Sequence, residues 1–111
     1  MKTFDLKNKA LHSETGESLL GFRDTGSHAC YMIYGTMKPG EKGRRIKPGA
    51  GHEEIVLAAK GDIEVAGFYS GTLKEGLAFL TQGDQECFLE NRGESRAVYV
   101  VAGGHFEADR H

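Results

Sequence analysis

The sequence lacks several features that mark whole classes of protein. It has no tryptophan, and only two prolines and two cysteines in 111 residues. Cys30 and Cys87 form no CxxC pair, which excludes a zinc ribbon and argues against a disulfide framework. Both lie in apolar segments, where a free thiol behaves as a small hydrophobic side chain. We therefore expect two buried free thiols.

Long apolar segments and an excess of positive charge are also missing. No run approaches the roughly 18 apolar residues of a membrane-spanning helix, and residues 1–14 show no signal-peptide pattern. The 14 Lys and Arg against 16 Asp and Glu leave a formal net charge of −2, so there is no global basic field for nucleic acid. We expect a soluble, cytoplasmic protein with neither nucleic acid nor membrane as a partner.

Glycine, in contrast, is abundant, with 16 residues spread between short apolar runs. Turn signals, such as those at 24–27 (DTGS) and 60–62 (KGD), recur about every eight to twelve residues, a spacing typical of an all-β sandwich or barrel. The length suits a single domain, 1–111. We expect its core over about 17–103, an N-terminal arm at 1–16 with a short edge strand at Phe4 and Leu6, and a loose tail at 104–111.

The segment 37–65 holds both prolines and the densest charge. It contains six Lys and Arg residues and a histidine beside two glutamates, and a hairpin over 54–59 and 62–69 begins within it. Functional groups are usually carried on loops held by a rigid β scaffold, so this segment is the candidate site. In a short strand over 43–47, Arg45 and Lys47 would face one way, and Arg44 and Ile46 the other.

Residues 52–57 (HEEIVL) with Gly61 resemble the first sequence motif of the cupins, which ends in a glutamate, six residues and a glycine. Six residues separate Glu54 from Gly61. Residues 37–40 (MKPG) resemble the lead-in to that motif, and 73–91 resemble the second motif. The resemblance covers about 28–103 and implies a cupin-like double-stranded β-helix, or jelly-roll barrel. It also implies a homodimer, because cupins commonly pair through edge strands.

A typical cupin holds one divalent metal with two histidines and a glutamate of the first motif and a histidine of the second. Glu54 matches that glutamate, but Arg45 and Lys47 stand most simply in the places of the two upstream histidines. With stricter spacing, the second of those places falls on Gly49 or Ala50. The place of the second-motif histidine falls on Glu86 or Cys87. The resemblance therefore implies the cupin scaffold without most of its metal ligands.

A rebuilt metal site is one interpretation of these residues. His52 and Glu54 are two positions apart, so they would share one face of a strand. With Glu86 or Cys87 opposite, they would make a mixed ligand set suited to zinc, iron or manganese. This set predicts a metal-dependent enzyme of isomerase or dioxygenase type.

A pocket for a polar or acidic ligand is the other interpretation, and the one we favour. Arg45 and Lys47 at the barrel mouth would repel a metal ion but bind a carboxylate or phosphate. Tyr34 would line the cavity, and Glu54 would be an ion-pair partner or general base, the one candidate catalytic residue. His28 and His105 are expected at the surface or the barrel rim. A non-catalytic interaction module is the third hypothesis, and the sequence leaves open whether any reaction is catalysed.

Overall fold

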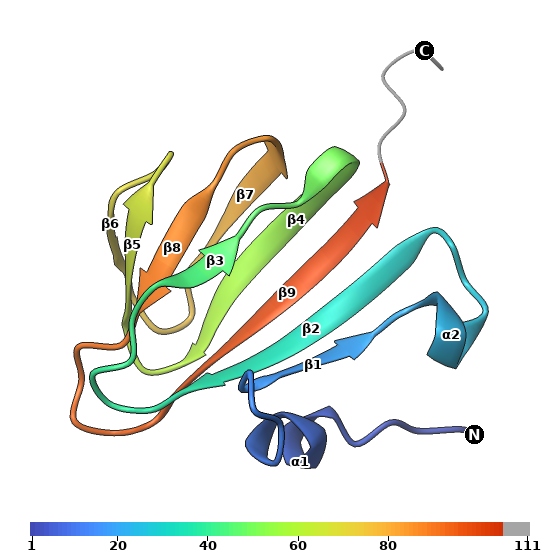
Figure 1. The fold of residues 1–111 in the computed structure, drawn as a ribbon, viewed down its shortest axis with the longest axis horizontal. Coiled ribbons are helices and arrows are strands. Elements are labelled where there is room, and N and C mark those ends of the chain that lie inside the picture. The colour runs from blue at the N-terminus through green and yellow to red at the C-terminus, as the bar shows by residue number, and fades with distance from the viewer. Residues whose placement is uncertain (106–111) are drawn as a thin grey trace.

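The computed structural model describes residues 1–105, which form two short helices and nine strands (Figure 1). In chain order these elements are α1 (Leu6–Leu11), β1 (Glu17–Leu20), α2 (Phe22–Thr25), β2 (Cys30–Met37), β3 (Arg44–Ile46), β4 (Gly49–Lys60), β5 (Ile63–Gly67), β6 (Gly71–Leu73), β7 (Ala78–Gly83), β8 (Cys87–Glu90) and β9 (Ala97–His105). Neither helix is long or apolar enough to cross a membrane.

The strands form two antiparallel sheets that face each other. One sheet has five strands in the order β1-β2-β9-β4-β7, and the other has four in the order β3-β8-β5-β6. Neighbouring strands in each sheet are often far apart in sequence, as Figure 1 shows for β9 between β2 and β4. The predicted all-β, double-stranded β-helix fold is confirmed.

Period-two alternation of side chains makes each sheet two-faced. In β9, Ala97, Tyr99 and Val101 are buried, while Val98 and Val100 between them are half-buried. In β4, Glu54, Val56 and Ala58 face inward in the same way. Successive side chains of a strand point to opposite faces, so these residues line the space between the sheets.

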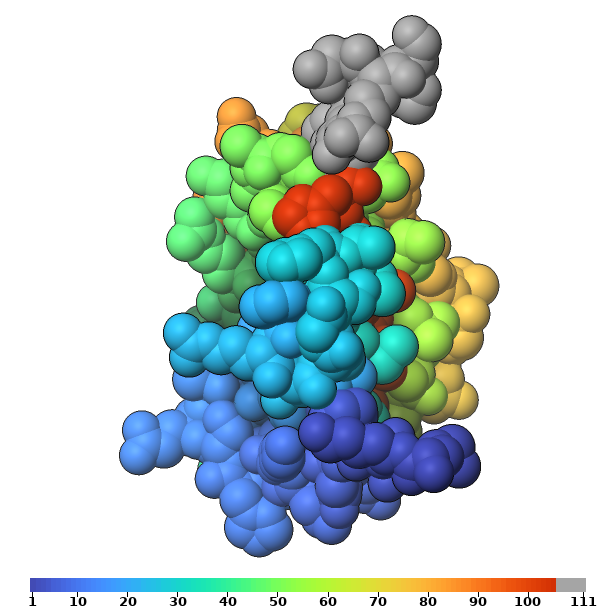
Figure 2. Space-filling model, turned by 90° about the vertical axis from the view of Figure 1, so that its right-hand side faces the viewer, coloured from blue at the N-terminus to red at the C-terminus, as the bar shows by residue number. Residues whose placement is uncertain are grey.

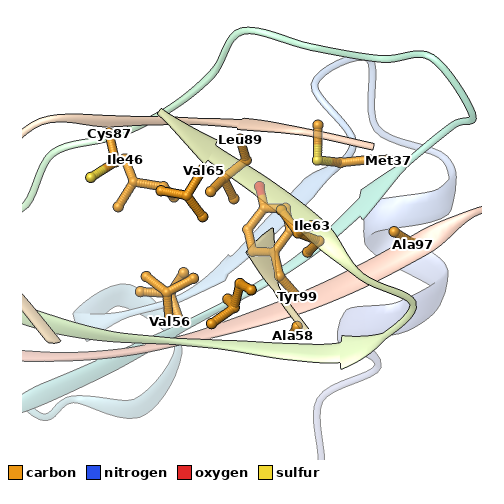
Figure 3. Close-up of a cluster of buried hydrophobic side chains, with 12 residues drawn as sticks. Met37, Ile46, Val56, Ala58, Ile63, Val65, Cys87, Leu89, Ala97 and Tyr99 are labelled. Carbon is orange, nitrogen blue, oxygen red and sulfur yellow. The ribbon is translucent and has the colours of Figure 1, made fainter. Parts of the chain in front are cut away.

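The apolar core fills most of that space (Figure 3). Its members come from both sheets: Met37, Ile46, Val56, Ala58, Ile63, Val65, Leu73, Cys87, Leu89, Ala97, Tyr99 and Val101. Cys87 is buried as predicted, but the same prediction for Cys30 is wrong. Cys30 is exposed because it begins β2 on the face opposite Tyr31 and Ile33.

Both helices occur where other structures were predicted. The edge strand expected at Phe4 and Leu6 is replaced by α1, which begins where the Asp5 carboxylate accepts a hydrogen bond from the Asn8 N–H at 3.1 Å. The turn expected at 24–27 is preceded by α2, which ends at Gly26 in the left-handed region (φ +76°). Of the predicted tail, 104 and 105 belong to β9, and 106–111 lie outside the described residues.

Candidate functional site

Four polar side chains come together on the inner face of the five-stranded sheet, at the end of the barrel where β2 and β4 begin and β9 ends. Strand register places Gly103 of β9 between Tyr31 of β2 and Glu54 of β4. The next pair along β4 and β9 on this face is His52 with His105. We call Tyr31, His52, Glu54 and His105 the mouth cluster. Figure 2 shows that the end of β9 reaches the surface between β2 and β4.

The Tyr31 hydroxyl reaches Glu54 across the intervening strand. Its Oη donates a hydrogen bond to Glu54 Oε2 at 2.5 Å. A Cβ atom added to Gly103 would lie 2.2 Å from Cζ of the Tyr31 ring, so the ring occupies the space that a side chain at 103 would need. Burial and the hydrogen bond to Glu54 raise the pKa of Tyr31, which keeps the phenol protonated and able to donate at neutral pH.

The two histidines of the mouth cluster lie side by side at the rim. Their ring centroids are 4.3 Å apart, and the Tyr31 ring meets His52 edge-on at 6.0 Å. Nδ1 of His52 lies 3.0 Å from the Ala50 carbonyl oxygen. Because a carbonyl only accepts, Nδ1 of His52 carries a proton and donates in this contact.

A cavity of about 330 Å³ adjoins this cluster on the side of β1 and α2. Its walls are mostly apolar, and it shares Tyr31 and His105 with the mouth cluster. The Phe22 and His28 rings stack in its wall with centroids 3.9 Å apart. The complete lining is Leu19, Gly21, Phe22, Ser27, His28, Cys30, Tyr31, Ile33 and His105.

The same cross-strand arrangement occurs a second time, nearer the opposite end of the barrel. Gly35 of β2 pairs with Tyr99 of β9 on one side and with Glu17 of β1 on the other. The Tyr99 ring lies over Gly35, whose added Cβ would be 2.1 Å from Cζ, and its hydroxyl donates to Glu17 Oε2. We call Tyr99, Gly35 and Glu17 the closed unit, and Tyr31, Gly103 and Glu54 the open unit. Tyr31 and Gly35 are about 13 Å apart along β2, at about 3.3 Å per residue.

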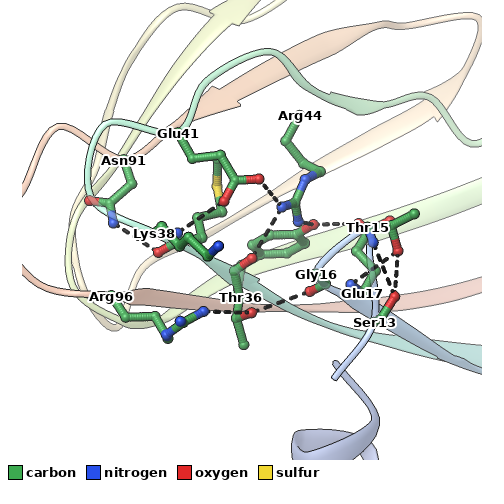
Figure 4. A network of polar contacts seen from close by, with 12 residues as sticks. Ser13, Thr15, Gly16, Glu17, Thr36, Lys38, Glu41, Arg44, Asn91 and Arg96 are labelled. Atoms are coloured by element: carbon green, nitrogen blue, oxygen red, sulfur yellow. Dashed lines mark hydrogen bonds and ion pairs between the residues drawn. The ribbon is translucent and has the colours of Figure 1, made fainter. Parts of the chain in front are cut away.

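Arg44 completes the closed unit (Figure 4). Its Nη1 donates to Tyr99 Oη at 2.7 Å, and its Nη2 donates to Glu41 Oε2 at 2.7 Å and to the Thr36 carbonyl at 3.1 Å. Burial and the bond to Glu17 raise the pKa of Tyr99. The phenol therefore serves as donor to Glu17 and acceptor from Arg44 at the same time.

The structure places the two predicted cationic ligands away from the mouth cluster. The predicted division of β3 is found, but its inward half is Arg44 with Ile46. Arg45 and Lys47 are exposed, and Arg45 Nε donates to Glu86 Oε2 at 2.5 Å. Burial of Ile46 decides this, because alternation then turns Arg44 inward and Arg45 outward. The role of Arg45 and Lys47 in ligand binding stays a prediction.

The remaining predicted residues also separate. Tyr34 lies on the outer face of β2, because Tyr31 and Ile33 face inward. Cys87 takes the interior position on β8 beside Ile46, and Glu86 pairs with Arg45. Only His52 and Glu54 share the inner face of one strand as predicted.

The structure does not assemble the metal ligands that the sequence suggested. Within residues 1–105, no three His, Cys, Asp or Glu side chains lie in positions to hold a metal ion. Cys87 is fully buried among apolar side chains of the core, and Glu86 is engaged by a guanidinium. A set of His52, Glu54 and Glu86 or Cys87 therefore does not fit a metal in this structure.

Sequence reasoning missed Tyr31, Gly103 and Arg44 as members of these polar units, and placed His105 only at the surface or rim. One signal was available, since Tyr31 alternates with Ile33 along β2. The other requirement was not visible, because the fit of Tyr31 over Gly103 depends on the pairing of two residues that are 72 positions apart in sequence.

Comparison with known proteins bears on the fold. No family model matches the sequence, and no curated protein matches it. Solved structures do resemble it. TT1209 from Thermus thermophilus superposes with a TM-score of 0.70 at 19% identity, over 95% of this chain and 98% of that one.

Two further similar structures belong to named proteins. Oxalate oxidase in complex with glycolate has a TM-score of 0.70 at 20% identity, over 85% of this chain and 53% of that one. The Cnp3 cupin domain of Schizosaccharomyces pombe has a TM-score of 0.62 at 13% identity, over 70% of this chain and 57% of that one. These identities are low, so the likeness concerns the path of the chain and not its chemistry.

Proposed function

Because this chain has the fold of the cupins, we propose that it binds a small polar molecule in the mouth of its barrel. One observation carries the proposal. The Glu54 side chain belongs to a residue that is only 7% exposed, and within residues 1–105 it receives one side-chain hydrogen bond, from a neutral phenol. No buried side-chain oxygen within residues 1–105 lacks a hydrogen-bond partner, so the second oxygen of Glu54 opens onto the mouth, where a ligand can donate to this largely desolvated carboxylate.

The adjoining cavity supports the same proposal. Small-molecule sites are usually concave and mostly apolar, with a few polar groups that orient the ligand. The cavity of about 330 Å³ has apolar walls on one side, and Tyr31 and His105 link it to the carboxylate. A ligand with one polar group and a short apolar body would use both parts.

Proton transfer on a bound ligand is a second candidate function. Carboxylates and imidazoles are the side chains that most often act as general acids and bases. Glu54 with two imidazoles at the same opening provides both kinds, and the hydrogen bond from Tyr31 holds Glu54 in one orientation. Glu54 remains the candidate base under this proposal.

Thermal-shift screening of small polar compounds, followed by calorimetry on any that bind, tests the primary proposal. We expect compounds that stabilise the wild type to lose their effect in Glu54→Gln and Tyr31→Phe. The chain offers matched controls in Glu53→Gln and Tyr34→Phe, which make the same changes on the outer faces of β4 and β2. Binding that survives Glu54→Gln, or that falls equally in the controls, would contradict a site at the mouth cluster.

We also propose that the protein forms a homodimer through sheet edges. The outermost strands are β1 and β7 in one sheet and β3 and β6 in the other, and an open edge presents unpaired backbone groups. Sedimentation velocity gives the mass in solution. A monomer at all concentrations tested would refute the homodimer and leave the binding site unaffected.

A further inference from the structure

The closed unit shows what kind of group completes a tyrosine and a glutamate placed across a glycine on this sheet. Tyr99 donates to Glu17, and the lone pair left on its hydroxyl accepts from Arg44 at 2.7 Å. The guanidinium thereby meets the Tyr99 hydroxyl, and its ion pair is with Glu41, at 2.7 Å. Arg44 is well shielded, since its side chain is 11% exposed.

The open unit has the same two members in the same order but no such cation. Within residues 1–105, no Lys or Arg forms an ion pair with Glu54 or donates to Tyr31. Two acceptors remain there, the second carboxylate oxygen of Glu54 and the lone pair of Tyr31 Oη. Their common requirement is a donor group, and the carboxylate favours one with positive charge.

We infer that the ligand of the mouth cluster carries a guanidinium or primary ammonium group on a short apolar stem. The inference rests on the proposed small-molecule site and names the class of its ligand. The cationic group takes the place beside Tyr31 that Arg44 takes beside Tyr99, and Glu54 pairs with its charge as Glu41 pairs with that of Arg44. The stem lies in the adjoining cavity against Leu19, Phe22 and Ile33.

A carboxylate ligand would meet the opposite conditions. Glu54 would repel it, and the Tyr31 proton, the nearest donor, is already engaged by Glu54. The cationic side chains expected to bind an acid, Arg45 and Lys47, are exposed, and Arg45 is paired with Glu86. The structure therefore favours a cation over the acidic ligand that the sequence suggested.

Isothermal titration calorimetry at low salt tests the inference with four probes that share one stem: n-butylguanidinium, n-butylammonium, n-butanol and n-pentanoate. We expect the two cations to bind, the alcohol to bind more weakly and the carboxylate not to bind. Loss of a hydrogen-bonded charge partner should lower cation affinity roughly 10- to 100-fold in Glu54→Gln. Glu53→Gln, whose carboxylate meets Gln82 on the outer face, should bind like the wild type.

A second variant tests whether charge alone explains the loss of cation binding. Gly103→Ala displaces the Tyr31 ring without removing any charged group, and we expect it to weaken cation binding as well. Circular dichroism of each variant establishes that it is folded before binding is measured.

The outcomes separate this inference from the proposal beneath it. If pentanoate binds and the cations do not, or if none of the four probes binds, the inference is wrong. The proposed small-molecule site fails only if the broader screen also finds no ligand that depends on Glu54. Equal loss of cation binding in Glu53→Gln and Glu54→Gln would mean that the cations bind the surface through net charge, and would also overturn the inference.

Discussion

The Tyr99 hydroxyl lies between Glu17 and Arg44, whereas the Tyr31 hydroxyl meets only Glu54 among the described residues. Both tyrosines lie over a glycine of the neighbouring strand, and both reach a glutamate on the strand beyond. The backbone therefore provides the same framework twice on one face of one sheet. What differs is whether the chain itself supplies the third partner.

The closed unit lies in more enclosed surroundings than the open unit. Near the closed unit, loops cover the end of the barrel, and the Asn91 side chain joins them by hydrogen bonds. Its Nδ2 donates to the carbonyls of Met37 and Ser95 at 3.0 and 2.9 Å, and it is buried. At the open unit, His105 is exposed and a cavity adjoins Tyr31. The comparison teaches that Arg44 completes the closed unit, whereas the open unit adjoins a cavity in which we propose that a ligand binds.

Replacing the two glycines should separate the roles most sharply. In Gly35→Ala the new methyl group overlaps the Tyr99 ring, which has no free space in the core, so we expect a loss of about 3 kcal/mol or more in the free energy of unfolding. In Gly103→Ala the Tyr31 ring can swing toward the mouth, so we expect about 1 kcal/mol. Urea unfolding measures both, and equal losses would mean that the units are equivalent.

Two single variants at neighbouring arginines of β3 test the structural role of the closed unit. Arg44→Met leaves Glu41, the Thr36 carbonyl and the Tyr99 hydroxyl without their shared donor, and we expect a loss of about 2–4 kcal/mol. Arg45→Met is the matched control on the same strand. Its side chain is 59% exposed, and its ion pair with Glu86 should contribute less than about 1 kcal/mol. A larger effect at Arg45 than at Arg44 would contradict the structural role of the closed unit.

The two glutamates should respond differently to loss of charge. Glu17→Gln weakens the attraction between Glu17 and Arg44 through Tyr99, so we expect a loss of about 1 kcal/mol. Glu54→Gln keeps an acceptor for Tyr31 and removes a shielded charge that has no cation beside it, so we expect less than about 0.5 kcal/mol of loss, or a gain. Thermal unfolding without ligand measures both, and a large loss in Glu54→Gln would point to a structural role for Glu54.

Alkaline pH should weaken both units through their tyrosines. The folded protein raises the pKa of Tyr31 and of Tyr99 above the ordinary value of about 10. Folding therefore favours the protonated phenols, and this stabilisation is complete below about pH 10 and is lost as the pH rises above it. We expect the fall in unfolding free energy between pH 9 and 11 to be smaller in Tyr31→Phe than in the wild type. An unchanged fall would show that Tyr31 is not linked to folding.

The sequence-based predictions succeeded for features that depend on residues close together in the chain, and failed for features that depend on residues far apart. Alternation and turn spacing predicted strands and an all-β fold, because both depend on neighbouring residues, and the resemblance to the cupin motifs implied the jelly-roll order. The inward pairing of His52 with Glu54 also followed from their spacing on one strand. The sequence could not predict which face of β3 points into the barrel. That choice depends on Ile46 packing with Cys87 and Leu89 in the core. For the same reason, Arg45 and Lys47 were expected where Arg44 is found.

By itself, the sequence determined which residues form strands, which faces of those strands are apolar, and that His52 and Glu54 lie on one face, since all of these follow from the period of two along a chain. Tertiary structure alone decided that Tyr31 meets Glu54 over Gly103 and that Tyr99 meets Glu17 over Gly35. It also decided that Arg44 meets the second pair, whereas within residues 1–105 no arginine donates to the first. The reason is that these contacts join three strands whose register is set when the sheet assembles, and no local pattern encodes a contact across two strand boundaries.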